Sequence, residues 1–315
     1  MHTYPADKPI YAIVGPTASG KTSLGVNLAI EIGGEIINCD SVQIYRGIQI
    51  ATAKPTLEEM RGVPHHLIDY VDPEINYTAA DWARDAARVI VDIEVRHRVP
   101  ILVGGTGFYL RTLREPLFDS PPTDLVLRER LRTKHKSKGA VHLHKILDKI
   151  DPETAKRLNP NDYVRTIRAI EVFLQTGKRI SFLQPDRAEP PPFADRIQLF
   201  VLDPPRDVLY EKINRRTEEH FSAGLVEEVT HLLATGVSDR TNALGAHAYR
   251  RVCEFLRGER DLASAIDKSK QDVRNYAKRQ LTWFRREHGS VWLRGFGDEE
   301  HVMSELLRCV QPRGS

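Results

Sequence analysis

Residues 15 to 22 combine glycine, lysine and hydroxyl side chains in a pattern that could hold a chain of phosphates. The segment Gly15-Pro16-Thr17-Ala18-Ser19-Gly20-Lys21-Thr22 follows G-x-x-x-x-G-K-[ST]. In such a loop, backbone N–H groups and a helix N-terminus surround the anion, the lysine neutralises its charge, and the last hydroxyl reaches Mg²⁺. The motif indicates a polyphosphate site, but it leaves kinases, ATPases, GTPases and other pyrophosphate chemistry open.

A carboxylate follows the next apolar strand. The strand expected at 35–38 leads into Cys39-Asp40-Ser41-Val42-Gln43, and the strand at 101–103 leads into Gly104-Gly105-Thr106. Ligands of open α/β sheets bind at the carboxyl ends of strands, so we expect Asp40 to lie near the phosphate loop. A structural role for Asp40 as a turn cap is the alternative. The second strand ends in glycines and a threonine instead of an acid, which disfavours ATP hydrolysis.

The elements that must position these residues alternate between strand and helix. Short β-branched runs are typical of buried strands, and apolar residues at helical spacing follow them. This alternation predicts an α/β fold, a P-loop NTPase-like parallel sheet flanked by helices on both faces. The expected strands cover 10–14, 35–38, 100–103 and 197–202, and the expected helices cover 23–32, 78–96, 207–233, 246–256 and 262–286.

Prolines bracket a segment of different character. Pro116, Pro121 and Pro122 mark its beginning, Pro185 and Pro190 to Pro192 mark its end, and its own pattern is helical. We therefore expect a mostly helical insertion domain at 119–195. It would interrupt a P-loop core domain formed by residues 1–118 and 196–315.

Positive charge is concentrated in two zones, although the net charge of the chain is only +3. Six lysines and arginines lie within 128–138. On the helix expected at 262–286, Arg274, Lys278 and Arg285 fall on one face and apolar residues on the other. Such zones could bind the phosphates of a nucleic acid, and the alternative is a solvated helix face.

Composition excludes several classes of protein. With 41% hydrophobic and 28% charged residues among 315, the chain is typical of a globular protein and not of a disordered one. No window reaches the ~18 consecutive apolar residues of a membrane span, and the first residues are polar, so we expect a cytoplasmic protein. Three distant cysteines (Cys39, Cys253, Cys309) and histidines without added partners predict reduced thiols and no protein-bound zinc. Nothing in the sequence requires more than a monomer.

Motifs that would identify a nucleoside triphosphate are missing. The sequence has neither the guanine-reading N-K-x-D nor the kinase H-R-D and D-F-G set. It combines instead a phosphate cradle, a nearby carboxylate and basic helices suited to RNA. Alkyl transfer from a pyrophosphate ester to a nucleobase nitrogen is a chemistry that uses all three features.

Several longer segments resemble one enzyme family. They are GPTASGKT (15–22), DSVQIYRGIQIATAKP (40–55), PHHLIDYVDP (64–73), YTAADW (77–82), ILVGGTGFYL (101–110) and AKRQLTWFR (277–285). Together these segments resemble the tRNA dimethylallyltransferase family, also called tRNA isopentenyltransferase. The resemblance implies Mg²⁺-dependent transfer of a dimethylallyl group from dimethylallyl diphosphate to N6 of adenosine 37 in tRNA. It also implies that the insertion domain contacts the anticodon stem-loop.

The resemblance further implies which residues act at the reaction centre. The loop 15–22 and an Mg²⁺ ion held by Thr22 would stabilise the departing diphosphate. Asp40 would take the proton of the adenine N6 amine. The residues to which the resemblance gives a catalytic role are Lys21, Asp40, Thr106 and Arg216.

Contacts with tRNA are expected from both domains. N6 of a stacked adenine cannot align with the donor carbon, so the base must be extruded into the enzyme. The residues expected to bind tRNA are Asp40, Ser41, Val42, Gln43, Thr106, Arg128, Val164, Arg165, Thr166, Ile167, Arg168, Arg274, Lys278 and Arg285. The chain departs from the family pattern at Ala51, Val164, Lys212 and Ala248, where members usually carry glycine, glutamine, arginine and glycine.

Two other hypotheses remain open at the level of sequence. A P-loop kinase, or an isopentenyltransferase acting on a free adenine nucleotide, would have little use for the insertion or the basic helix. An RNA-binding protein that has lost catalysis is expected to lack Lys21, Thr22 or Asp40, and all three are present.

Overall fold

The computed structural model describes residues 8–310, and the chain divides into two compact units. The core unit contains the residues up to Arg114 together with those from Pro191 onward, and the helical unit is Glu115–Pro190. The insertion therefore begins at residue 115 where the sequence predicts 119, and ends at 190 where it predicts 195.

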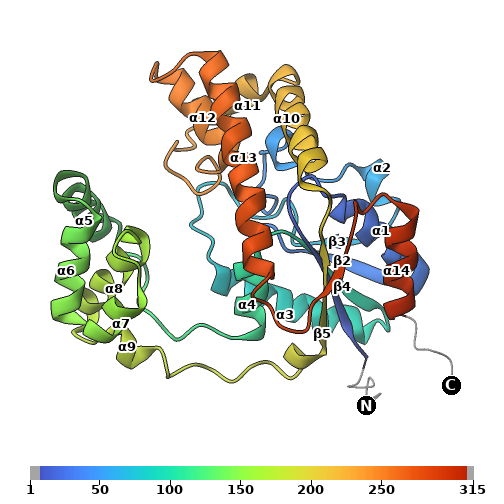
Figure 1. Ribbon diagram of the computed structural model, residues 1–315, viewed down its shortest axis with the longest axis horizontal. Helices are drawn as coiled ribbons and strands as arrows, with labels where there is room; N and C mark the ends of the chain where they lie inside the picture. The colour runs from blue at the N-terminus through green and yellow to red at the C-terminus, as the bar shows by residue number, and fades with distance from the viewer. Residues whose placement is uncertain (1–7, 311–315) are drawn as a thin grey trace. The chain divides into compact units, whose positions relative to one another are not determined.

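A six-stranded parallel sheet forms the centre of the core unit, in the order β3-β2-β4-β1-β5-β6 (Figure 1). The strands are β1 Ile10–Val14, β2 Gly34–Asn38, β3 His65–His66, β4 Val99–Gly104, β5 Ile197–Leu202 and β6 Val291–Leu293. Because β1 lies between β4 and β5, the phosphate loop that follows β1 begins at the same sheet edge as the loops after β2 and β4.

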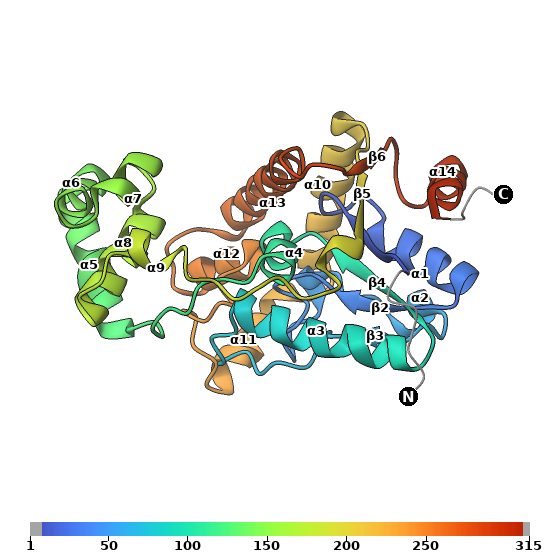
Figure 2. The same ribbon diagram turned by 90° about the horizontal axis from the view of Figure 1, so that it is seen from below.

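Helices cover both faces of this sheet. They are α1 Lys21–Ile32, η1 Ile50–Thr52, α2 Leu57–Met60, α3 Ala79–Val95, α4 Gly107–Arg114, η2 Ala194–Arg196, α10 Arg206–Ser222, α11 Leu225–Ala234, α12 His247–Leu256, α13 Leu262–Phe284 and α14 Glu300–Val310. Ile10 and Ala12 of β1 pack in a core with α3, α4, α11 and α12. Tyr11 and Ile13 pack in a second core with α1 and α14. Figure 2 shows α14 and α3 on opposite sides of the sheet. The alternation explains why every residue of β1 is apolar.

α3 is fixed directly behind the candidate site. It begins at a capping box, in which Thr78 Oγ1 accepts the Asp81 N–H and the Asp81 carboxylate accepts the Thr78 N–H. The buried Trp82 then donates its indole N–H to the carbonyl oxygen of Asn38 at 2.9 Å. Asn38 ends β2, so this bond holds the strand two residues before Asp40.

The helical unit has a small core of its own. Its helices are α5 Leu125–Lys138, α6 Ala140–Ile150, α7 Pro152–Arg157, α8 Tyr163–Thr176 and α9 Ile180–Leu183. Leu143, Leu147, Ile170 and Val172 are buried in this core. Buried Asp151 accepts the Thr154 N–H and the Ser181 N–H, both at 3.0 Å, and thereby connects α7 with α9.

Parts of the core unit differ from the sequence prediction. The helix expected over 207–233 is interrupted at Gly224, whose φ of 95° lies in the left-handed region, so that α10 and α11 are separate. β3 has two residues and is too short to show a periodic pattern. The sequence pattern does not predict β6 or α14, which complete the sheet and its second core.

Two further findings concern membrane-spanning helices and the three cysteines. Within residues 8–310, no helix has the length and apolar character needed to cross a membrane. Cys39 and Cys253 are buried, Cys309 is exposed, and each is a free thiol. Burial raises the pKa of Cys253 to about 11, so this side chain is an uncharged part of the core.

Candidate active site

The phosphate loop connects β1 with α1 and requires glycine at both of its ends. A Cβ atom on Gly15 would lie 3.0 Å from the carbonyl oxygen of Leu202 in β5. Gly20 is the N-cap of α1 with a φ of 83°, and a Cβ there would lie 2.8 Å from the backbone nitrogen of Gly297. The loop is therefore held between β5 and the segment that follows β6.

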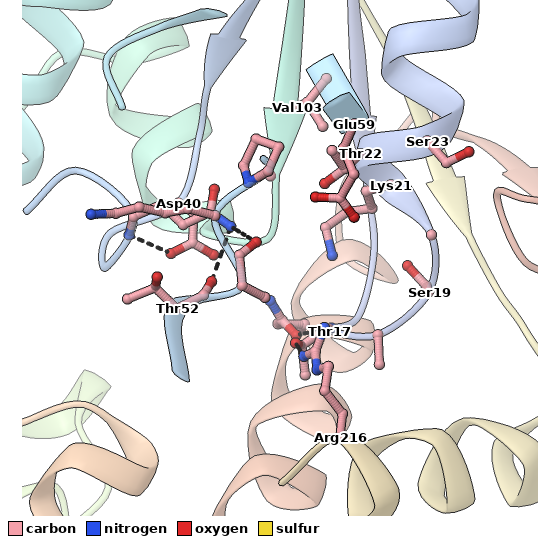
Figure 3. A pocket seen from close by; sticks show the side chains of 18 residues that line it. Thr17, Ser19, Lys21, Thr22, Ser23, Asp40, Thr52, Glu59, Val103 and Arg216 are labelled. Carbon is pink, nitrogen blue, oxygen red and sulfur yellow. Dashed lines mark hydrogen bonds between the residues drawn. The ribbon is translucent and has the colours of Figure 1, made fainter. Parts of the chain in front are cut away.

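A cavity of about 330 Å³ lies against this loop (Figure 3). Its wall includes residues 17–23 of the loop and α1, residues 52–55, and the side chains of Asp40 and Arg216. Figure 3 shows Lys21, Asp40 and Arg216 arranged around the same space. The structure thus brings together the predicted phosphate loop, the predicted carboxylate and the predicted arginine.

Three cations, Lys21, Lys54 and Arg216, line this cavity. Lys21 Nζ donates to the carbonyl oxygen of Pro16 at 2.6 Å. Burial, with a smaller effect of Arg216, lowers the pKa of Lys21 to about 8 against the opposing effect of Asp40. Arg216 donates to Thr17 Oγ1 at 2.5 Å, and burial lowers the pKa of its guanidinium. An anion that enters the cavity would relieve the electrostatic cost of these buried positive charges.

Asp40 both caps a turn and faces the cavity. Its Oδ1 accepts the Val42 N–H at 2.9 Å and the Gln43 N–H at 3.4 Å, which is the structural role that a turn aspartate commonly has. The carboxylate also lines the cavity and raises the pKa of Lys21. The two roles are compatible, because one oxygen fixes the orientation of the carboxylate and the other can accept a proton.

Thr106 connects the loops that follow β2 and β4. Its N–H donates to the carbonyl oxygen of Cys39 at 3.1 Å, and its Oγ1 accepts the Ser41 N–H at 3.0 Å. The backbones are in close contact here, since a Cβ on Gly104 would lie 2.1 Å from the Cys39 oxygen. Thr106 therefore lies directly beside the segment 40–43.

A second cavity, of about 710 Å³, borders the same segment. Asp40 and Gln43 line the first cavity, whereas Ser41, Val42 and Thr106 line the second. Other residues that line the second cavity are His247, Arg250, Tyr276 and Arg279. Burial and then the charge of Asp40 raise the pKa of the Tyr276 hydroxyl. A small cationic cavity and a wider aromatic and basic cavity thus share the segment 40–43.

Three side chains that line the two cavities, Gln280, His247 and Tyr276, are not singled out by the sequence pattern. Gln280 Oε1 accepts the Thr17 N–H at 2.8 Å, and its Nε2 donates to the Gly105 carbonyl oxygen at 2.9 Å. Its signal in the sequence is its helical spacing of three and four residues from Ala277 and Phe284, which places a polar residue on the apolar face. His247 and Tyr276 have ring centres 4.3 Å apart but come from different helices, so no local spacing connects them.

The side chain of Gln43 has partners within the protein. Its Nε2 donates to the carbonyl oxygens of Thr52 and Ala53, at 3.1 and 2.9 Å. The amide therefore supports the wall of the first cavity, while the neighbouring Val42 is half-buried against the core. A contact of Gln43 with an extruded base stays a prediction.

The start of α1 fits a magnesium ion that is held mainly by its substrate. Thr22 lines the cavity, and the buried Ser19 Oγ has no hydrogen-bond partner among the described residues. Mg²⁺ prefers oxygen ligands and usually combines few protein ligands with phosphate oxygens and water. Within residues 8–310, no group of three or more His, Cys, Asp or Glu side chains could hold a metal. The hydroxyl groups of Thr22 and Ser19 fit a magnesium ion whose other ligands are phosphate oxygens and water.

α13 has the basic face that its sequence predicts. Lys278 and Arg285 are exposed, while Ala277 and Phe284 are buried. Arg274 is half-buried and donates to Asn214 of α10. Two of the three predicted cations are therefore presented to solvent.

Arg128 and Arg168 are engaged inside the helical unit. Both guanidinium groups bind the fully buried Glu171, at 2.7 and 3.0 Å. Removal of one partner from such a buried group is costly, so we assign these arginines first to the stability of the unit. Val164 and Arg165 are exposed on α8 and remain predicted tRNA contacts.

Three other residues that the sequence analysis names, Thr166, Ile167 and Ala248, are buried. Thr166 and Ile167 lie on the inner side of α8 and are 0% and 3% exposed. Their side chains offer little surface to RNA, and a contact of these two residues with tRNA stays a prediction. Ala248 belongs to α12 and is buried in the core that this helix shares with the sheet.

Two further departures from the family pattern have local partners. The Ala51 N–H donates to the Tyr249 hydroxyl at 3.1 Å. Lys212 Nζ lies 3.7 Å from the centre of the Phe296 ring and 3.7 Å from Asp298. Lys212 therefore packs against the segment that follows β6 and supports the phosphate loop.

The sheet order, the phosphate loop after β1 and the cationic cavity define a P-loop α/β protein that handles a phosphorylated substrate. Comparison with known proteins makes this more specific. The model of the family described as IPP transferase matches residues 43–287. The chain belongs to the IPP transferase family.

Individual relatives are similar over nearly the whole chain. The tRNA dimethylallyltransferase of Koribacter versatilis is 44% identical, over 97% of this chain and 99% of its own. The solved structure of the full-length tRNA isopentenylpyrophosphate transferase from Bacillus halodurans has a TM-score of 0.70 at 39% identity, covering 96% of this chain and 95% of that one. A eukaryotic dimethylallyltransferase acting on tRNA has a TM-score of 0.76 at 26% identity, covering 96% and 78%. The family and the fold class expected from the sequence are confirmed.

Proposed function

We propose that this protein transfers the dimethylallyl group of dimethylallyl diphosphate to N6 of adenosine 37 in tRNA. The observation that carries the proposal is the position of Asp40, on a segment that borders a cavity lined by Lys21 and Arg216 and a second, aromatic and basic cavity. The relatives, which are named as tRNA dimethylallyltransferases, support tRNA as the acceptor. Because tRNA is the acceptor, we place the reaction in the cytoplasm.

The first cavity would hold the diphosphate leaving group. The N–H groups of the loop 15–22, together with Lys21 and Arg216, would stabilise the negative charge that grows as the C1–O bond breaks. Thr22 would help to hold an Mg²⁺ ion, which would supply further neutralisation of the diphosphate charge. The bond that breaks joins carbon to oxygen, so no phosphoryl group is transferred.

Asp40 would act as the general base. N6 of adenine is a weak nucleophile, because its lone pair is delocalised into the ring. As N6 supplies the electron pair of the new N6–C1 bond, the C1–O electrons leave with the diphosphate and the N6 proton becomes acidic. The second oxygen of Asp40, which the turn does not use, would accept this proton.

The second cavity would receive the extruded base. The rings of His247 and Tyr276 provide surfaces on which a base can stack, and Arg250 and Arg279 provide positive charge. The exposed Lys278 and Arg285 would contact the RNA backbone. We infer that the helical unit adds contacts to the anticodon stem-loop through the basic residues of α5.

The test supplies labelled dimethylallyl diphosphate and Mg²⁺ together with unmodified tRNA, AMP or ATP as acceptor. We expect label in tRNA alone, and digestion should locate it at adenosine 37. The matched control is the same tRNA with guanosine at this position, which should stay unlabelled. Label in AMP but not in tRNA would instead identify an enzyme of free nucleotides and overturn the proposal.

A further inference from the structure

We propose that Glu228 and Tyr249 form a clamp that positions residues 49–54, which supply part of the wall of the diphosphate cavity. Thr52, Ala53 and Lys54 line that cavity, whereas the two clamp residues are not among those that line it. The clamp would therefore act on the substrate through the loop. The inference rests on the proposed function for the identity of the ligand.

The clamp binds three consecutive backbone N–H groups. Glu228 Oε2 accepts the Gln49 N–H at 3.0 Å and the Ile50 N–H at 3.2 Å. Glu228 Oε1 accepts the Tyr249 hydroxyl at 2.7 Å. The same hydroxyl oxygen accepts the Ala51 N–H at 3.1 Å. Two side chains thus fix the backbone that leads directly into the cavity wall.

Both clamp residues belong to rigid elements. Glu228 is on α11, and Tyr249 is on α12, where it is 1% exposed and packed in the core beneath the sheet. Burial and the charge of Glu228 raise the pKa of the Tyr249 hydroxyl, which therefore stays protonated and donates to the carboxylate. The position of the loop is consequently set by the packing of two helices and not by the loop alone.

The loop has a backbone that needs such support. Ala53 has a φ of 51°, in the left-handed region that is unfavourable for a residue with a Cβ atom. Strained conformations of this kind persist only where the surrounding structure fixes them, and they are found at functional sites. Gln43 supplies one set of supports, through its bonds to the carbonyl oxygens of Thr52 and Ala53. The clamp supplies the other, on the N–H groups just before them.

The same loop is connected to the proposed base. Gln43 bonds the loop with its side chain, and its backbone N–H donates to Asp40 Oδ1 at 3.4 Å. A shift of residues 49–54 would therefore alter both the wall of the cavity and the turn that orients Asp40. We expect the clamp to matter for dimethylallyl diphosphate and not for tRNA, because the loop lines the first cavity and not the second.

The first test is Tyr249→Phe, which removes one hydroxyl and keeps the ring in the core. The expected result is a rise of about five- to tenfold in KM for dimethylallyl diphosphate, with KM for tRNA unchanged. The matched control is Tyr11→Phe. Tyr11 is also buried, and its hydroxyl donates to the carbonyl oxygen of Val310 at 3.4 Å, in the core on the other face of the sheet. This control should leave both KM values as in the wild type.

The second test is Glu228→Gln, with the exposed Glu227→Gln on the same helix as its control. A glutamine keeps one acceptor oxygen for the loop N–H groups, but its NH2 group cannot accept the tyrosine O–H, so the expected rise in KM is similar to that of Tyr249→Phe. The double variant should be no worse than either single variant, because both remove the same clamp. Unchanged KM values in both single variants, or additive effects, would overturn the inference.

Failure of the proposed function would give a different result. If the wild type did not label tRNA, the clamp would be judged from the Kd of dimethylallyl diphosphate measured by calorimetry, where the same weakening is expected. Wild-type affinity in both clamp variants would then overturn the inference independently of the reaction.

Discussion

Gln280 accepts the N–H of Thr17 at 2.8 Å and so joins α13 to the phosphate loop. The other end of its amide donates to the Gly105 carbonyl oxygen at 2.9 Å, after β4. One side chain, 4% exposed, thus connects the helix proposed to contact RNA with two loops of the reaction centre. Binding of RNA along α13 and binding of diphosphate in the loop share this connection.

Replacement of Gln280 by alanine should lower stability and weaken substrate binding together. The change leaves the Thr17 N–H and the Gly105 carbonyl oxygen without their partner, at a cost of about 1–3 kcal/mol for a buried group. Urea unfolding measures the loss, and initial rates should show a higher KM for dimethylallyl diphosphate. Thr282→Ala, at an exposed position on the same helix, is the control. If Gln280→Ala unfolded like the wild type, these two hydrogen bonds would not stabilise the protein.

Asp40→Asn should separate catalysis from the turn-cap role. Asparagine keeps an oxygen that can accept the Val42 and Gln43 N–H groups, but it cannot accept a proton. We expect the rate constant measured in a single-turnover assay to fall by about 10²- to 10⁴-fold, the usual contribution of a general base. The affinity for tRNA, measured by filter binding, should stay close to that of the wild type. An equal loss of turnover and affinity would show that Asp40 acts through structure alone.

How far the sequence predicts this site depends on how local each feature is. The phosphate loop and Asp40 follow single strands, so their place at the sheet edge could be inferred from adjacent residues. The second cavity could not, because His247 and Tyr276 meet only when α12 packs on α13. Helical spacing places Glu171 three residues beyond Arg168 on α8, but it gives no sign that Glu171 is buried and also binds Arg128 of α5.

The pKa of Lys21 predicts how substrate binding depends on pH. Burial is the main cause that lowers this pKa from its ordinary value of 10.5 to about 8. As pH rises through this value the free enzyme loses the positive charge, so the affinity for dimethylallyl diphosphate should fall. The phosphate groups themselves ionise near pH ~6 and add no change there. Calorimetry should show that the affinity of the wild type for dimethylallyl diphosphate falls as pH rises through about 8. Lys21→Met should bind weakly at every pH and show no such fall.

Stability should change in the opposite direction over the same range. Because the pKa of Lys21 is lower in the folded than in the unfolded chain, the unfolded state binds more protons between pH 8 and 10.5. The contribution of Lys21 to stability is therefore unfavourable below this window and is relieved as pH rises through it. The unfolding free energy of the wild type should therefore rise relative to that of Lys21→Met as pH increases from 8 to 10.5. A constant difference would contradict the assigned pKa.

The basic face of α13 predicts a salt-dependent contribution to tRNA binding. Lys278→Ala and Arg285→Ala should each weaken binding and reduce the slope of log affinity against log salt by about one. Arg274→Ala should change the slope less, because this side chain is half-buried and bound to Asn214. Arg308→Ala, at an exposed position on α14, is the control. An unchanged slope in the first two variants would exclude this face from the RNA contact.

Gly297 supports the phosphate loop from the segment that follows β6. Its N–H donates to the carbonyl oxygen of Ser19 at 2.8 Å, and a Cβ on Gly297 would lie 2.2 Å from the carbonyl oxygen of Gly20. Because the close neighbour is backbone, Gly297→Ala must displace one of the two segments. We expect KM for dimethylallyl diphosphate to rise by about tenfold, since small displacements of binding groups are costly, while the affinity for tRNA is retained.

The control for Gly297→Ala is Gly258→Ala, which distinguishes the stability cost of backbone strain from a displacement of the phosphate loop. Gly258 has a φ of 73° and nothing within 4 Å of the position of a Cβ atom. Alanine there should lower the unfolding free energy by about 1 kcal/mol through backbone strain alone and leave KM unchanged. If Gly297→Ala also kept the wild-type KM, the geometry of the phosphate loop would be set by β1 and α1 without help from the segment after β6.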